Sequence, residues 1–401
     1  MARDVVAAVR ERGDDAIVEL TAKYEGRSIA PHEFELDPMT WHTASTRVPT
    51  SLRTALERAA ESIRTFHRTQ IPSSTGTTSE TARLESRVDA LERVAMYVPG
   101  GTASYPSSVL MSAIPAKVAG VRELIMLTPR PVDVVLAAAE IAGVDRIFAI
   151  GGAQAIAAVA FGTRTVPRVD KVVGPGNAYV TAAKRLVFGR CDIDSIAGPS
   201  EILVMADETA DPDLVAADLI SQAEHDVLAC PVLITDDAGL ADAVDAALEQ
   251  QLRDLPRRDI AMRALLDHGA VVLVEGRDAM VTEANAYAPE HVALMVSEPA
   301  ALADRITCAG AIFVGAWTPE AAGDYAAGPS HVLPTAGGAR FSSPLGVWDF
   351  VKYTSVLELG HHWLESAAPT ITTLARAEGF EGHARAVELR LSKHRGKERS
   401  S

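Results

Sequence analysis

The sequence of 401 residues lacks the features that mark several classes of protein. Its three cysteines, Cys191, Cys230 and Cys308, are widely spaced, odd in number and outside any CxxC pair. A disulfide framework is therefore not indicated, and each thiol is more typical of a small buried side chain than of a nucleophile. No apolar run approaches the roughly 20 residues of a membrane-spanning helix. The start, "MARDVVAAVRERGDDAIVEL", lacks the apolar core of a signal peptide, so we expect a cytoplasmic protein.

Positive charge is also scarce. There are 38 Lys and Arg residues against 53 Asp and Glu, which gives a formal net charge of −15. No strongly basic stretch precedes the short tail "KHRGKERS". Because a nucleic-acid-binding protein needs a cationic surface, nucleic acid is not an expected partner. With 48% hydrophobic and 23% charged residues, the chain has the composition of a folded globular protein long enough for two domains.

Short runs rich in Val and Ile alternate with amphipathic helical runs from about residue 120 onwards. "RELIMLTP" is followed by "VDVVLAAAEIAG", and "SEILVMAD" by "DPDLVAADLISQAEHD". This alternation predicts an α/β fold with parallel sheets and helices on both faces. The units are too many for one modest sheet and do not give an eightfold barrel, so two doubly wound halves are predicted. Helical patterns open the chain, and a mostly helical segment follows "VWDFVKYTSV".

Six unusual loops combine Gly or Pro with polar groups. Since ligands of open parallel sheets bind at the carboxyl ends of the strands, we expect all six loops at such ends, around a single crevice. They are residues 97–108, 151–154, 174–177, 197–201, 288–291 and 323–335.

A helix-like run, "DLISQAEHDVLA", contains Gln222 and His225 three positions apart, and therefore on one helical face. This is either a solvated helix end or half of a metal site. Further ligands would come from Asp324 and from His331 or His383. Mixed nitrogen and oxygen donors suit zinc or another first-row dication, although a Gln amide is an unusual zinc ligand.

The dipeptide Glu290-His291 would place a carboxylate beside an imidazole, which suits proton transfer near pH 7. Nicotinamide binding is only weakly indicated by the residues themselves. The G-x-G-x-x-G fingerprint is missing, and "GGAQAIA" and "GPGNAYV" do not match it. Backbone amides at a helix N-terminus can still bind phosphate without it.

Seven stretches, in order and at similar spacing from about residue 3 to about 390, resemble histidinol dehydrogenase. They are "YVPGGTASYPSSVLMSAIPAKVAGV", "GGAQAIAAVAFGT", "VDKVVGPGNAYVTAAK", "AGPSEILVMAD", "DLISQAEHD", "ANAYAPEHV" and "GDYAAGPSHVLPT". The resemblance implies two incomplete Rossmann-like halves with a small helical C-terminal segment. It also implies NAD-dependent oxidation of L-histidinol, through the bound aldehyde, to L-histidine, the last steps of histidine biosynthesis.

The resemblance also implies roles for individual residues. The zinc ligands would be Gln222, His225, Asp324 and His383, which together with His291 would also contact the substrate. Glu290 and His291 would handle protons, with His291 as the base for the hydroxyl and Glu290 activating water for the second oxidation. Further substrate contacts would be Ser200, His331 and Glu378, and the NAD contacts would be Tyr97, Gln154 and Asn177.

A homodimer is implied, with the C-terminal segment reaching the partner subunit's active site. We expect residues 1–92 and 201–345 to form the metal and substrate domain. Residues 93–200 would form the NAD domain, and residues 346–401 the C-terminal segment.

Several positions depart from the family pattern. The chain starts without the further N-terminal segment usual in the family; if that segment contributes to dimer contacts, subunit association would be weaker or differently arranged. Ala90 and Ala95 stand where Pro and Gly are usual, and Ser330 stands where Asn is common. Three alternatives remain at this point. They are a paralogous zinc- and NAD-dependent dehydrogenase of another amino alcohol or polyol, a zinc hydrolase that uses Glu290, and a catalytically inactive scaffold.

Overall fold

The computed structural model describes residues 1–100 and 104–398, so part of the expected loop 97–108 lies outside the described residues. The chain divides into two units, described separately below. The first contains residues 1–71 and 90–350, and the second residues 72–89 and 351–401. Within the described ranges, no helix is both long enough and apolar enough to cross a membrane.

The first parallel sheet has the strand order β5-β4-β3-β6-β7. Its strands are β3 (Arg93–Tyr97), β4 (Glu123–Leu127), β5 (Arg146–Phe148), β6 (Lys171–Val173) and β7 (Asp192–Ile193). Four consecutive residues of β4, "LIML", are buried. Since successive strand residues point to opposite faces, both faces of this sheet are covered by helices. Ala95 lies in regular register between Ile125 and Val172, so its departure from the family pattern leaves the strand intact.

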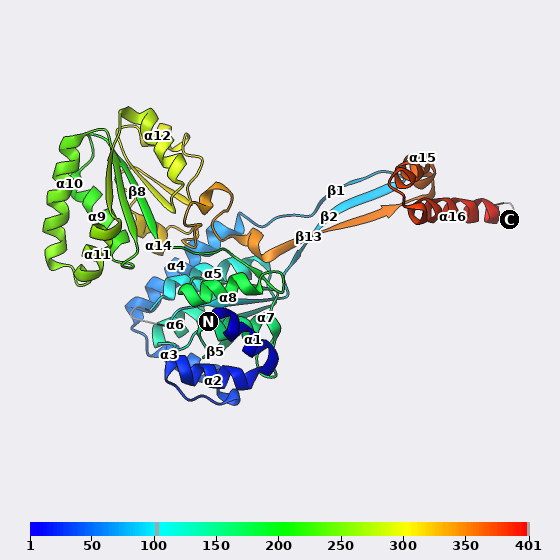
Figure 1. Cartoon of the computed structure of the whole chain (residues 1–401), viewed down its shortest axis with the longest axis horizontal. Coiled ribbons are helices and arrows are strands. Elements are labelled where there is room, and N and C mark those ends of the chain that lie inside the picture. Colours follow the sequence, from blue (N-terminus) through cyan, green and yellow to red (C-terminus); the bar gives the residue numbers. More distant parts are fainter. Residues whose placement is uncertain (101–103, 399–401) are drawn as a thin grey trace. The chain divides into compact units, whose positions relative to one another are not determined.

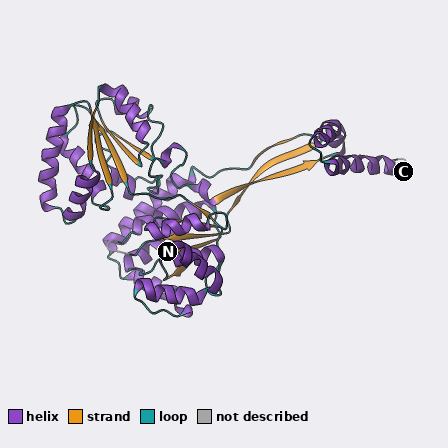
Figure 2. Cartoon of the chain, in the orientation of Figure 1, coloured by secondary structure: helices purple, strands orange, loops and turns teal. Residues whose placement is uncertain are grey.

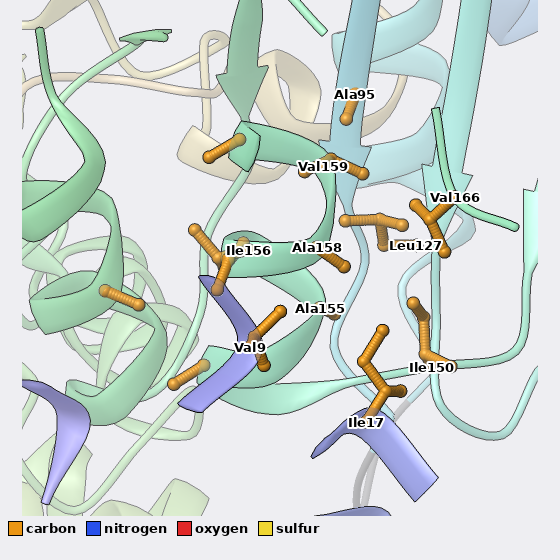
Figure 3. Close-up of a cluster of buried hydrophobic side chains, with 14 of the residues drawn as sticks. Val9, Ile17, Ala95, Leu127, Ile150, Ala155, Ile156, Ala158, Val159 and Val166 are labelled. Atoms are coloured by element: carbon orange, nitrogen blue, oxygen red, sulfur yellow. The ribbon is translucent and has the colours of Figure 1, made fainter. Parts of the chain in front are cut away.

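Helices cover the first sheet on both sides. Those between its strands are α5 (Pro106–Ala119), α6 (Asp133–Ala142), α7 (Gly152–Phe161) and α8 (Ala178–Val187). Those before it are α1 (Ala2–Arg12), α2 (Asp14–Glu25), η1 (Pro31–Glu33), α3 (Pro38–Thr46) and α4 (Thr50–Arg68). Val9 of α1 and Ile17 of α2 share one apolar core with Ile156 of α7 and Leu127 of β4 (Figure 3). On the other side, α3 packs on α6 and α4 on α5.

The packing of these N-terminal helices differs from the expected grouping of residues 1–92 with 201–345. An amphipathic helix carries an apolar stripe but no signal for which of two sheets will cover it. The boundaries of the two domains stay a prediction.

The second parallel sheet has the order β10-β9-β8-β11-β12. Its strands are β8 (Glu201–Ala206), β9 (Cys230–Thr235), β10 (Ala270–Leu273), β11 (His291–Met295) and β12 (Ala311–Val314). Its helices are α9 (Pro212–Ala223), α10 (Ala238–Gln251), η2 (Leu252–Asp254), α11 (Arg258–His268), α12 (Gly276–Tyr287), α13 (Pro299–Ala303) and α14 (Glu320–Tyr325), and η3 (Gly338–Arg340) and η4 (Val347–Phe350) follow. Figure 2 shows helices on both faces of these strands.

The predicted fold class is confirmed, because both sheets are parallel and doubly wound, and helices end the chain. The two sheets also share one topology. In each, the first strand along the chain is central, the next two follow on one side and the last two on the other. The strand order therefore reverses beside β3 and β6 in the first sheet, and beside β8 and β11 in the second.

Three of the six loops lie at the carboxyl ends of strands, as predicted, and three do not. The described residues of loop 97–108, and loops 151–154 and 174–177, follow β3, β5 and β6 at the carboxyl edge of the first sheet, as predicted. Loops 197–201 and 288–291 precede β8 and β11, at the amino edge of the second sheet, so their prediction was wrong. Loop 323–335 begins within α14, well after β12. Gly and Pro occur in the loops on either side of a strand, so composition does not tell which end a loop occupies.

The second unit contains a three-stranded sheet and two helices. β1 (Thr75–Thr78) pairs antiparallel with β2 (Ala82–Ala90), and β13 (Val351–Leu359) lies on the other side of β2 (Figure 1). α15 (His361–Ala377) and α16 (Glu381–Glu398) follow β13 and pack on each other.

Candidate active site and metal centre

The amino ends of β8 and β11 hold a reciprocal pair of buried glutamates. The backbone N–H of Glu201 donates to Glu290 Oε2 over 2.9 Å, and the backbone N–H of Glu290 donates to Glu201 Oε2 over 3.3 Å. Glu201 Oε1 also accepts from the backbone N–H of Ala336. The sequence prediction missed Glu201, although it directly follows Ser200 in the stretch "AGPSE". Its carboxylate joins the start of β8 to two other loops and so fixes Glu290.

His291, the first residue of β11, is 4% exposed and has its tautomer set by a backbone group. Its Nδ1 lies 2.9 Å from the carbonyl oxygen of Glu201. Since a carbonyl only accepts, Nδ1 carries the hydrogen and Nε2 is the basic nitrogen. Burial lowers the pKa of His291 to about 4, so the ring is neutral at pH 7.

Burial shifts the pKa of Glu290 in the opposite direction from that of His291. Burial raises the pKa of its carboxyl to about 8, and the neighbouring carboxyls of Glu201 and Asp324 contribute in the same direction. At neutral pH its carboxyl holds a proton unless a cation lies near, because positive charge favours the ionised form.

The candidate metal ligands Gln222 and His225 lie where α9 ends, and the backbone N–H of His225 donates to the carbonyl of Gln222. His225 Nε2 is 4.0 Å from Asp324 Oδ2, and His331 Nδ1 is 3.6 Å from Asp324 Oδ1. Burial raises the pKa of Asp324, but the hydrogen bond from His331 and the charges of nearby histidines outweigh it and lower the pKa below its usual value. The polar end of α9 thus faces an ionised carboxylate.

A further carboxyl, Glu320, was also missed by the sequence prediction. It lies one helical turn before Asp324 on α14 and is 0% exposed. One nitrogen of His291 and one carboxylate oxygen each of Glu320 and Asp324 lie within 4.8 Å of one another. The spacing of four residues between Glu320 and Asp324 is the signal that could have identified it.

The charges at this site suit a bound cation. Glu290, Glu320 and Asp324 are largely buried, and within the described part of the chain their ion-pair contacts are all with histidines. Buried carboxylates need compensating positive charge. The nitrogen and oxygen donors of Gln222, His225 and Asp324 therefore fit a first-row divalent ion such as zinc.

Of the other predicted substrate residues, some lie near this site and some belong to the second unit. His331 Nδ1 is 3.2 Å from the carbonyl oxygen of Asp324, and His331 Nε2 is 3.5 Å from Ser108 Oγ at the start of α5. This contact joins the carboxyl edge of the first sheet to the site at the second sheet. Ser200 directly precedes β8. Glu378 and His383 belong to the second unit, where both are exposed.

The predicted cofactor residues lie around the reversal of strand order in the first sheet. Tyr97 ends β3, and its hydroxyl oxygen accepts from the backbone N–H of Gly152 over 3.1 Å. Gln154 Nε2 donates to Glu25 Oε1 over 3.3 Å, a partner that the sequence prediction did not include. Asn177 caps α8, accepting from the backbone N–H groups of Tyr179 and Val180.

A buried ion pair supports the loop that carries Asn177. The ammonium of Lys184 pairs with Asp194 and donates to the carbonyl oxygen of Gly174 over 3.0 Å. Asp194 Oδ2 accepts from the backbone N–H of Gly174 over 2.7 Å. Gly174 has φ +102°, and a Cβ there would lie 2.3 Å from the carbonyl oxygen of Tyr97. The loop therefore approaches β3 as closely as only glycine permits.

The equivalent position in the second sheet is filled by a side chain. Asp207 follows β8, and its carboxylate accepts from the backbone N–H and hydroxyl of Ser297, beyond β11, and from Arg277 and Thr209. Burial raises the pKa of Asp207, but the hydrogen bonds from Thr209 and Ser297 outweigh it and lower the pKa to about 2. The carboxyl edge of this sheet is thus closed between β8 and β11.

Comparisons with known proteins all lead to one family. The family model for histidinol dehydrogenase matches residues 1–391. The histidinol dehydrogenase of Rhodospirillum rubrum is 51% identical over 396 residues, covering 97% of this chain and 91% of the relative. That of Ruegeria pomeroyi is 50% identical over 397 residues, covering 98% and 92%.

Solved structures show the same likeness. The crystal structure of histidinol dehydrogenase from Elizabethkingia anophelis superposes with a TM-score of 0.92 at 35% identity, covering 98% of this chain and 92% of that one. An acetylating aldehyde dehydrogenase from Geobacillus thermoglucosidasius matches with a TM-score of 0.50 at 13% identity, covering 86% of this chain and 97% of that one, a likeness of fold alone.

Proposed function

The chain belongs to the histidinol dehydrogenase family, and on this premise we propose how its residues oxidise L-histidinol, through L-histidinaldehyde, to L-histidine with two molecules of NAD⁺. The observation that carries the assignment of roles is the position of Glu290 and His291 beside the Asp324 carboxylate. A proton-accepting ring, a second carboxyl and a candidate cation site thereby lie within reach of one small substrate.

His291 is the base of the first oxidation. Its Nδ1–H is held by the carbonyl of Glu201, so the unprotonated Nε2 faces the site and takes the proton of the substrate hydroxyl as the hydride leaves. A neutral, buried imidazole is the form that accepts a proton, and a positioned base of this kind typically contributes about 10²- to 10⁴-fold.

Glu290 acts in the second oxidation. The aldehyde must add water before a second hydride can leave, and the Glu290 carboxylate removes a proton from that water. Its backbone and side chain are both tied to Glu201, which fixes the carboxyl next to His291. Because burial raises the pKa of Glu290, a nearby cation is needed to keep its carboxyl ionised at neutral pH.

Gln222, His225 and Asp324 would hold a zinc ion, completed by His383 from the C-terminal segment of a partner subunit in a homodimer. The ion would supply a template for the imidazole and amino nitrogens of the substrate. Ser200, His331 and the partner's Glu378 would orient the rest of the substrate. The exposure of Glu378 and His383 in their own unit supports a role in another subunit's site.

Tyr97, Gln154 and Asn177 would contact NAD⁺ at the carboxyl edge of the first sheet. The dinucleotide would supply the hydride acceptor for each step. The α8 N-terminus, capped by Asn177, offers backbone N–H groups to a phosphate even though the usual glycine fingerprint is absent.

The proposal is tested by counting NADH formed per L-histidinol consumed, before and after treatment with a chelator and after zinc is restored. We expect two NADH per substrate, lost on chelation and regained with zinc. His225→Ala should lose both zinc and activity, whereas His268→Ala, an exposed histidine at the end of α11, should lose neither. A folded, zinc-loaded protein that forms no NADH from L-histidinol would contradict the proposal.

A further inference from the structure

Glu320 has no role in the chemistry above, yet it contacts both halves of the site. It is fully buried at the first residue of α14. Its Oε1 is 3.8 Å from Nε2 of His291, and its carboxylate faces the side-chain amide of Gln222. A carboxylate in such a position needs hydrogen-bond donors, because a buried charge without partners is costly.

The amide of Gln222 supplies those donors. Only the nitrogen of an amide can donate, so an ionised Glu320 carboxylate is satisfied when the Gln222 amide is turned with Nε2 towards it. In that orientation Nε2 lies 2.5 Å from Oε1 and 3.1 Å from Oε2. The amide oxygen then points away from Glu320. Gln222 is 0% exposed, so solvent does not compete for either amide atom.

This orientation matters because the two ends of an amide have similar shapes and opposite chemistry. Rotation by half a turn would present the nitrogen, which has no lone pair for a cation, in place of the oxygen. A neutral amide oxygen is also a weak ligand and gains most from a partner that holds it in place. Groups that orient ligands in this way typically affect metal affinity by about 10- to 100-fold.

We propose that Glu320 is a positioning residue, which holds the Gln222 amide with its oxygen towards the cation while packing against the basic nitrogen of His291. The inference rests on the zinc site of the proposed function. It accounts for a buried carboxyl that makes no ion pair with Lys or Arg within the described residues.

The test is the zinc affinity of the full-length enzyme, measured by competition with a coloured chelator. Glu320→Leu removes both acceptor oxygens, and we expect zinc to bind about 10- to 100-fold more weakly. Glu320→Gln keeps one acceptor for Nε2 of Gln222, so its affinity should stay within about threefold of the wild type. The visible spectrum of the cobalt(II)-loaded protein should change in Glu320→Leu, since the ligand geometry changes, and stay close to wild type in Glu320→Gln.

Asp218→Asn is the matched control. Asp218 lies on α9 one turn before Gln222, is 6% exposed and raises the pKa of Glu320, but makes no hydrogen bond to Gln222 within the described residues. Its substitution removes a neighbouring buried carboxyl without touching the amide, so zinc affinity should hold. Circular dichroism and NAD⁺ affinity check that each variant is folded.

Three results would overturn the inference. Zinc affinity in a folded Glu320→Leu within about threefold of wild type would show that the amide needs no support. An equal loss in Glu320→Gln would show that the charge matters rather than the acceptor. If Gln222→Ala itself bound zinc normally, the proposed ligand set would fail. Weakened binding in Gln222→Ala with normal binding in Glu320→Leu would reject only the role of Glu320.

Discussion

His291 and Glu290 are adjacent in the chain, but their different surroundings suit them to different chemical roles. The ring of His291 is neutral at pH 7 and has its basic nitrogen defined by a backbone hydrogen bond. The carboxyl of Glu290 has its pKa raised by burial and is tied to the neighbouring strand. Substitution of each residue should therefore affect a different oxidation.

Glu290→Gln should separate the two oxidations. The amide keeps the shape of the carboxyl and its acceptor for the backbone of Glu201, but it cannot remove a proton from water. We expect NADH per L-histidinol to fall from about two towards one, with the second step slowed about 10²- to 10⁴-fold. End-point NADH together with trapping of the aldehyde measures both effects.

Glu298→Gln serves as the control for that experiment, because this exposed carboxyl follows the opposite end of β11. It should leave the yield of NADH unchanged. A full yield from Glu290→Gln at the wild-type rate would assign water activation to another group.

The sequence indicated candidate ligands that the structure places near one another, but it did not indicate the buried carboxyls that contact them. Gln222, His225 and Asp324 fall in recognisable stretches, and the structure brings them together. Glu201 and Glu320 act through hydrogen bonds to residues far away in the chain, and such contacts leave no local pattern. A buried carboxyl looks in the sequence like any surface Glu.

At the scale of elements, the loop from Gly174 to Asn177 depends on one glycine. Gly174→Ala would bring a Cβ within 2.3 Å of the Tyr97 carbonyl oxygen and force the loop away from β3. We expect KM for NAD⁺ to rise about tenfold or more, with little change in zinc affinity. Steady-state kinetics at varied NAD⁺ concentrations measures this.

Gly189→Ala separates backbone strain from the clash. Gly189 also has a positive φ, of +91°, but a Cβ there meets nothing within 4 Å. Both substitutions should cost about 1 kcal/mol of stability for the unfavourable φ. An equal rise in KM for both variants would remove Gly174 from the cofactor site.

Asp207 should contribute to stability rather than to catalysis, since it closes the edge of the second sheet opposite to the site. The pKa of about 2 in the folded protein lies below the ordinary value of 3.8 for Asp, so its stabilisation is fully present above pH 3.8 and is lost as pH falls through 2. Asp207→Asn should lower the free energy of unfolding by about 2 kcal/mol at pH 7, and by less at pH 3.

Thermal melting at both pH values measures this difference, with Asp278→Asn, an exposed partner of Arg305, as the control. A large loss of activity in a folded Asp207→Asn protein would mean that the closed edge takes part in the reaction.

The alternation of strands and helices was enough to predict two parallel sheets, because the pattern is local. It was not enough to predict which edge of the second sheet carries the site. Loops 197–201 and 288–291 have the composition of ligand-binding loops, and only the direction of β8 and β11 reveals that they lie at the amino ends. Nor did the pattern of Val9 and Ile17 indicate that α1 and α2 cover the first sheet.

At the scale of the whole molecule, the proposed homodimer predicts complementation between inactive subunits. A His291→Asn chain and a His383→Asn chain are each expected to be inactive as homodimers. If His383 acts in the partner's site, a mixed dimer contains one site with both histidines intact. Random reassortment should then restore about a quarter of wild-type activity, measured after mixing, denaturation and refolding.

Mixing each variant with wild type controls for the efficiency of refolding. If His383 served its own subunit, every site in the mixed dimer would remain defective, and activity would not return.

The two sheets share one topology, but in the second sheet Asp207 and Arg277 occupy the strand reversal, whereas the proposed NAD⁺ contacts lie around that of the first. If NAD⁺ binds at the first reversal, as proposed, the chain accommodates one dinucleotide at a time. Two hydrides must then leave in succession to two different molecules of NAD⁺, and the first reduced cofactor must depart before the second arrives. The aldehyde has to stay bound at the proposed site through that exchange, so the second oxidation is completed only when the aldehyde is released more slowly than the cofactor is replaced.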